Sequence, residues 1–245
     1  MVTHETWLAG LFNTYLTGLG NWLLALFGQT AENAREPWAD HVVMQLLVAL
    51  VIVLVLALLR SRLSVDKPGG LQHFFEIVHS FLDEQAHDQI GPGSRKHIVL
   101  FETLFVFLLL SNMLGIVPGF MSPTQVVYVP VGCALVAFLY YNYVGVRKNG
   151  LGKYLLHFVG PIPVMAPLMI PIEIISHLAR PLSLTIRLFA NMYAGEQVTL
   201  VFLSLTYLVI PAAFMGLHVF VGVLQAYIFV LLTMMYIAGA TAEEH

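Results

Sequence analysis

The sequence has 245 residues, of which 58% are hydrophobic and only 10% are charged, and its mean hydropathy is +0.82. Soluble domains carry about 25% charged residues, so this composition excludes a soluble protein and predicts an all-α protein that crosses a membrane several times. The formal net charge of −3 gives no reason to expect nucleic-acid binding. Cys133 is the single cysteine, which excludes a disulfide framework and a cysteine-based metal site.

Residues 1–40 are expected to form an external N-terminal segment. Residues 7–28 are apolar but rich in glycine, and they lack the preceding basic residues of a secretory signal. We interpret residues 7–28 as an interfacial or surface segment. An additional membrane span is the alternative that this stretch leaves open.

The next part of the chain contains two different apolar patterns. Residues 42–59 form an uninterrupted apolar run, long enough to cross about 30 Å of hydrocarbon. In residues 71–90 the apolar side chains instead recur at helical spacing and make one stripe: Leu71, Phe74, Phe75, Val78, Phe81 and Leu82. The polar face of this second helix is acidic, so docking to a protein explains it better than attraction to anionic lipid. We expect it to lie along the cytoplasmic membrane surface.

Residues 98–117 and 125–146 are predicted to be two further spans joined by a tight external turn. The first of them carries Glu102, which fits a position at the membrane boundary, and Asn112, which could bridge helices or line a path. Basic residues set the orientation of membrane helices, and they occur only on one side of this pair: Arg60, Arg62, Lys67, Arg95, Lys96, Arg147, Lys148 and Lys153. The N-terminus should therefore be external and the C-terminus cytoplasmic.

The last third of the chain predicts a hairpin of two long helices, residues 168–195 and 197–242. Residues 197–242 contain no Asp, Glu, Lys or Arg, and one helix of that length would extend about 69 Å. Since this is more than twice the hydrocarbon thickness, we expect a strongly tilted helix with Pro211 as a candidate bend. The predicted fold is thus about five membrane helices plus one amphipathic surface helix.

A row of polar side chains crosses the first helix of this hairpin. Glu173, Arg180 and Arg187 are spaced at seven residues and Asn191 follows Arg187 by four, so these four residues share one helical face, here called the polar seam. A charged side chain near mid-membrane costs about 3 kcal/mol on insertion scales, and such a residue is a functional candidate by default. His218 and Gln225 are also seven apart on the second helix. Antiparallel pairing would bring the two rows together. The fixed cation of Arg187 would then lie between titratable side chains on both sides, along water-accessible paths from opposite faces of the membrane.

Two long motifs carry a specific resemblance. The run SLTIRLFANMYAGE at residues 183–196 resembles the signature of subunit a of the membrane sector of the rotary F-type ATP synthase. The run LQAYIFVLLTMMYI at residues 224–237 and the EEH ending resemble the end of bacterial members. The resemblance extends through NMLGIVPG and SPT over most of the chain and is loose before residue 40.

The resemblance implies a stationary proton-channel subunit with two offset half-channels. Arg187 matches the arginine that faces a carboxylate on the rotating ring of c subunits. The remaining matched positions are Asn191, Glu196, His218 and Gln225 for the external half-channel, Glu173, Ser176 and Ser183 for the cytoplasmic half-channel, and Tyr236 and His177 as further candidates. The implied partners are the c-ring, the peripheral-stalk b subunits, the rest of the ATP synthase and membrane lipid. The implied location is the bacterial inner membrane, with no cofactor and no metal.

Five of these residues also have a simpler explanation. Arg187 could form a structural ion pair, Gln225 could make a helix–helix hydrogen bond, and Ser176 and Ser183 could bond backbone carbonyls. For His177 a packed or hydrogen-bonded role is the favoured interpretation. Two other function classes predict different signals: a secondary transporter should show internal repeats, and an intramembrane enzyme that uses Glu and His should show a nucleophile motif or metal-ligand spacing such as HExxH. Neither signal is found in the sequence.

Overall fold

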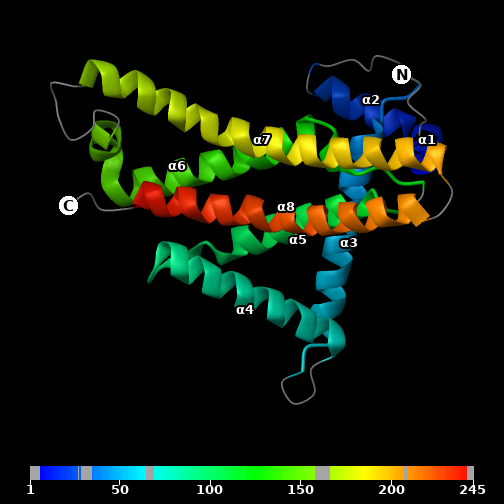
Figure 1. Ribbon diagram of the computed structural model, residues 1–245, viewed down its shortest axis with the longest axis horizontal. Coiled ribbons are helices and arrows are strands. Elements are labelled where there is room, and N and C mark those ends of the chain that lie inside the picture. The colour runs from blue at the N-terminus through cyan, green and yellow to red at the C-terminus, as the bar shows by residue number, and fades with distance from the viewer. Residues whose placement is uncertain are drawn as a thin grey trace.

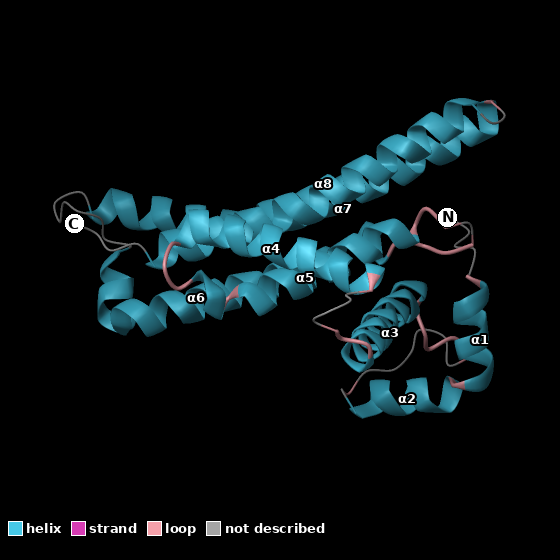
Figure 2. Cartoon of the chain, turned by 90° about the horizontal axis from the view of Figure 1, so that it is seen from below, coloured by secondary structure: helices cyan, strands magenta, loops and turns pink. Residues whose placement is uncertain are grey.

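The computed structural model describes residues 6–26, 28, 35–64, 69–117, 119–157, 166–206 and 209–241. Across these ranges the protein is all-α, with no strand. Two long helices, α7 (Ala166–Leu205) and α8 (Val209–Thr241), run side by side through the molecule (Figures 1 and 2). The chain is an all-α membrane protein: in the described part, α3, residues 128–150 of α6, and α8 are each long and apolar enough to cross a membrane.

The N-terminal segment forms two short helices, α1 (Trp7–Tyr15) and α2 (Thr17–Leu26), which meet at an angle (Figure 2). Each is about 15 Å long, which is too short to cross the hydrocarbon. The side chain of Asn13 fixes this corner by bonding the backbone N–H and carbonyl of Trp38 at 2.9 and 3.2 Å. Residues 7–28 therefore do not form the single additional span that the sequence left open.

Helices α3 (Asp40–Ser61) and α4 (Gly70–Ile90) follow the two apolar patterns seen in the sequence. Only Val43, Met44 and Val48 of α3 are buried, so most of its apolar surface is free to face lipid. The amphipathic helix α4 packs through buried Leu82 and Ala86, in contact with α5 and α8. Its placement on the cytoplasmic membrane surface stays a prediction.

Helices α5 (Ile98–Leu114) and α6 (Tyr128–His157) form the centre of the bundle together with α7 and α8. Short 3₁₀ turns precede them, η1 (Ser94–Lys96) and η2 (Pro123–Gln125). Helix α6 extends past the expected end at residue 146 and changes direction at Gly150, whose φ of +76° is left-handed. Glycine populates this region readily because it lacks a Cβ.

The hairpin of α7 and α8 differs from the sequence expectation in where it turns. Helix α7 continues through residue 196 to Leu205, so the junction lies about ten residues later than the expected boundary. Nothing at residue 196 stops a helix, whereas Pro211 lies in the first turn of α8, where a missing N–H costs nothing. Pro211 is thus a helix start and not a bend. At about 60 and 50 Å, both helices are longer than the hydrocarbon thickness. The EEH ending lies outside the described residues.

Candidate functional site: the polar seam of α7 and its contact with α8

The polar seam lies at the edge of the contact between α7 and α8. Leu184, Leu188 and Met192 form the buried stripe of α7 and belong to the main hydrophobic core. Arg187 and Asn191 each precede one of these buried residues, and they are half-buried and exposed, respectively. The seam therefore runs along the margin of the interface, where its side chains can reach both α8 and the outside of the bundle.

Among the described residues, Arg187 has one weak hydrogen-bond partner. Its Nη2 donates to Ser183 Oγ at 3.3 Å, and no carboxylate of the described residues lies within 4.0 Å of its guanidinium. The alternative of a structural ion pair thus has no support in this part of the chain. A guanidinium remains charged under ordinary conditions, and no carboxylate in the described ranges compensates the charge of Arg187.

Small side chains surround Arg187 on the exposed face of α7. They recur at helical spacing and all of them are exposed: Ser176, Ala179, Ser183, Ala190 and Ala194. In membranes, small residues let a second helix approach the backbone closely. The surface beside the arginine is therefore shaped for close contact with another helix.

The rows on α7 and α8 meet, as the antiparallel arrangement requires. Asn191 Nδ2 donates to Gln225 Oε1 at 2.8 Å. Gln225 is buried, and its Nε2 has no hydrogen-bond partner among the described residues. A buried N–H without a partner costs about 1–3 kcal/mol, so this amide is a place where water or an outside group would bind.

A second contact lies farther along α7, where the imidazole of His218 packs closely against the backbone at Gly195. A Cβ at position 195 would lie only 2.3 Å from His218 Nδ1, so glycine is required for this approach. Glu196 follows directly and is half-buried. The structure thus brings Glu196 and His218 to the same level of the hairpin. Gly195 is a contributor that the sequence reasoning missed, although it is part of the SLTIRLFANMYAGE motif.

The first part of α7 holds two predicted cytoplasmic residues, Glu173 and Ser176, and a separate group around Arg180 and His177. Glu173 is half-buried and Ser176 is exposed, and no described hydrogen bond or ion pair connects either of them to another element. Arg180 lies against the rings of Tyr141 and Tyr236, with its Cζ 5.9 and 5.4 Å from the ring centroids. Tyr236 therefore contacts Arg180 and not Arg187.

His177 belongs to this second group and is hydrogen-bonded, as the favoured interpretation expected. Its Nε2 lies 2.9 Å from Asn142 Oδ1 on α6, and the hydroxyl of Tyr141 lies 3.3 Å from the ring nitrogens. Tyr154 bonds the same amide oxygen at 2.7 Å. The sequence reasoning missed Asn142 and Tyr154, because no periodic pattern or motif marks them and the change of direction at Gly150 brings them together.

A buried polar network connects α5, η2 and α8. Asn112 Nδ2 donates to the carbonyl of Gly222 at 2.9 Å, and Thr124 Oγ1 donates to Asn112 Oδ1 at 2.7 Å. Both Asn112 and Thr124 are fully buried. Asn112 therefore bridges elements, which is one of the two roles that its sequence position left open. The network lies close to Gln225, one helical turn along α8 from Gly222.

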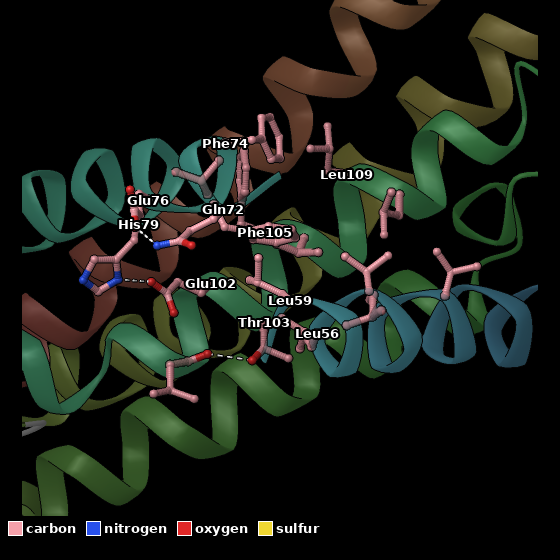
Figure 3. Close-up of a pocket in the computed structure, with 18 of the residues that line it drawn as sticks. Leu56, Leu59, Gln72, Phe74, Glu76, His79, Glu102, Thr103, Phe105 and Leu109 are labelled. Atoms are coloured by element: carbon pink, nitrogen blue, oxygen red, sulfur yellow. Dashed lines mark hydrogen bonds and ion pairs between the residues drawn. The ribbon is translucent and has the colours of Figure 1, made fainter. Parts of the chain in front are cut away.

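A cavity of about 730 Å³ lies elsewhere, between α3, α4 and α5 (Figure 3). Its lining is mostly apolar, and it includes the paired side chains of His79 on α4 and Glu102 on α5. Glu102 is thus a link between these helices rather than only a boundary residue. No residue of α7 or α8 lines this cavity, so it is separate from the polar seam.

Comparison with known proteins gives consistent matches. The chain matches the family model described as ATP synthase A chain over residues 42–238. ATP synthase subunit a of Solibacter usitatus is 62% identical over 235 residues, covering 96% of this chain and 100% of the relative. The protein of the same description from Koribacter versatilis is 44% identical over 242 residues, covering 99% of each chain. These matches confirm the resemblance that the two sequence motifs indicated.

Proposed function

This chain belongs to the ATP synthase A chain family, and from that membership and the geometry around Arg187 we propose that it is the stationary proton channel of the enzyme's membrane sector. Protons enter one half-channel, neutralise a carboxylate on a rotating ring of c subunits, travel with the ring and leave by the second half-channel. Each charge that crosses gains about 2.3 kcal/mol per 100 mV. Rotation couples this free energy to ATP synthesis in the soluble sector, to which b subunits connect the chain.

The observation that carries the proposal is the cation of Arg187, which has no counter-charge among the described residues and lies beside an exposed strip of small residues. A carboxylate on a closely approaching helix would supply that counter-charge. An opposite charge within about 4–6 Å lowers the pKa of a carboxyl group, so Arg187 favours proton release from each arriving ring site. The same positive charge repels protons that would otherwise pass directly between the half-channels.

Polar side chains on either side of Arg187 support two separate proton half-channels. On the external side these are Asn191, Glu196, His218 and Gln225, which connect α7 to α8 through the contacts described above. On the cytoplasmic side, Glu173, Ser176 and Ser183 lie along α7 before Arg187. Glu196 and Glu173 are about 13 and 21 Å from Arg187 along the helix axis. The cation therefore separates two titratable groups along one helix.

Replacement of Arg187 tests this function. Arg187→Ala should reduce ATP synthesis by at least about 100-fold, the scale for loss of one preorganised electrostatic group, and should permit passive proton leak. Arg187→Lys should also fail, because a desolvated lysine can lose its proton and lacks the planar fork. Synthesis is measured in inverted vesicles, and conductance after removal of the soluble sector.

Arg180→Lys is the matched control, on the same helix and the same face. Lysine can keep its cation against the rings of Tyr141 and Tyr236, so this variant should retain most of the synthesis. Near-normal synthesis by either Arg187 variant, with the complex assembled, would show that Arg187 is structural and that the proposed mechanism is wrong.

A further inference from the structure

The change of direction in α6 places Tyr154 against the body of the same helix. Gly150 adopts φ +76° and ψ +153°, and residues 151–157 turn back toward the start of α7 (Figure 1). A Cβ at Gly145 would lie 2.6 Å from Cε2 of Tyr154, so the tyrosine ring packs directly on the helix backbone at a position that only glycine allows. Tyr154 is buried as a result.

Hydrogen bonds then connect this returning segment to α7 through one amide. Asn142 Nδ2 donates to the carbonyl of Phe138 at 2.7 Å, which orients Oδ1 away from its own helix. Tyr154 donates to that Oδ1, and burial raises the pKa of Tyr154, so the hydroxyl keeps its proton. His177 Nε2 lies 2.9 Å from the same oxygen. Because an amide oxygen only accepts, Nε2 of His177 must be the protonated, donating nitrogen.

The same region also holds the end of α8. Lys148 Nζ donates to the carbonyl of Thr241 at 2.7 Å, and Asn149 Nδ2 donates to the carbonyl of Ala240 at 3.1 Å. The last carbonyls of a helix lack partners within the helix, and a cation there is favourable to the helix dipole. Residues around Gly150 therefore contact both long helices, α7 through His177 and α8 through its last turn.

Helix α7 needs outside support at this end. Pro171 and Pro181 lie inside it, and each removes one backbone hydrogen bond from the stretch that carries Glu173 and Ser176. At the opposite end of the hairpin, α7 and α8 are joined covalently by residues 206–208. Near Gly150 their relative position depends on contacts between side chains and backbone.

We propose that Asn142, Lys148, Asn149, Tyr154 and His177 form a clamp that fixes the cytoplasmic ends of α7 and α8 relative to each other, with His177 as a positioning residue and not a proton carrier. The inference rests on the proposed function, because the clamp would hold Glu173 and Ser176 in the cytoplasmic half-channel.

The first test measures hydrogen exchange in the assembled ATP synthase. Tyr154→Phe removes one hydroxyl and keeps the ring packing, so the complex should assemble. The loss of one hydrogen bond should make backbone exchange in residues 166–180 about fivefold faster. Tyr143→Phe is the matched control, because this exposed tyrosine of α6 bonds only Arg147 among the described residues. Unchanged exchange in both Tyr154→Phe and His177→Leu would overturn the clamp.

The second test separates positioning from proton transfer. Glutamine offers an N–H near the position of His177 Nε2 but does not titrate, so His177→Gln should retain most ATP synthesis with an unchanged pH profile. His177→Leu should lose synthesis about fivefold. If His177→Gln lost activity as fully as His177→Leu, His177 would be a proton carrier and the inference would be wrong. The exchange result does not depend on Arg187, so failure of the proposed function and failure of the clamp can be told apart.

Discussion

The contact between Gly195 and His218 gives the sharpest prediction about the external path. In Gly195→Ala, the added Cβ would lie 2.3 Å from Nδ1 and 2.9 Å from Cε1 of the imidazole. Ordinary van der Waals contacts are about 3.5–4.0 Å, so the ring must move by about 1 Å or more, or the helices must separate. Overpacking of this kind costs about 1–3 kcal/mol. A misplacement of 1 Å can cost about 100-fold in rate, so we expect ATP-driven proton pumping to fall by one to two orders of magnitude.

Pumping is measured as acidification of inverted vesicles, normalised to the amount of assembled complex. Gly216→Ala is the matched control, because a Cβ at that position of α8 meets nothing within 4 Å. The double variant Gly195→Ala, His218→Ala should recover thermal stability relative to Gly195→Ala, since the clash is gone, while pumping stays low. The reasoning is refuted if Gly195→Ala pumps as fast as Gly216→Ala.

Two further predictions concern structure outside the seam. Asn112→Leu should destabilise the assembled complex by about 1–3 kcal/mol, because it leaves the buried hydroxyl of Thr124 without that acceptor; an unchanged thermal midpoint would contradict this role. Burial, with a smaller contribution from Lys96, lowers the pKa of His97 below its usual 6.5. The folded state therefore favours the neutral imidazole, and the full stabilisation from this group is present above pH 6.5. Stability should therefore fall as the pH drops from 6.5 through the lowered pKa, and His97→Gln should reduce this loss between pH 7.5 and 5.5; an equal loss would refute it.

Much of this architecture could be predicted from local patterns. The apolar run of residues 42–59 and the stripe of residues 71–90 lie within helices α3 and α4. The seven-residue separation of His218 and Gln225 also predicted that α8 would present a polar row to α7, and both residues do contact α7. These features depend on helical periodicity and hydrophobicity, which are properties of short stretches of sequence.

The remaining features depend on contacts between distant residues. The turn of the hairpin lies after Leu205 because nothing at residue 196 interrupts a helix, and absence of an interruption is a weak signal. The reversal at Gly150 requires a left-handed residue, but many glycines in this sequence lie in ordinary helix. Tyr154 and Asn142 acquire their roles only after that reversal. Such roles follow from the tertiary structure and not from a local pattern.

The two arginines of α7 show what the fold adds to the sequence. Arg180 and Arg187 are seven residues apart on one face, so by spacing they are equivalent. In the folded chain, Arg180 lies against two aromatic rings that stabilise its charge, whereas the one described hydrogen bond of Arg187 is a long bond to a serine hydroxyl. An uncompensated cation in a membrane costs free energy. A carboxylate on a neighbouring helix would relieve that cost by pairing with Arg187, so the two groups attract each other. Protonation of the carboxylate removes the attraction, so Arg187 would hold a charged ring site and release a neutral one. In the proposed mechanism, proton uptake is converted into movement at this point because no residue in the described ranges supplies Arg187 with a counter-charge.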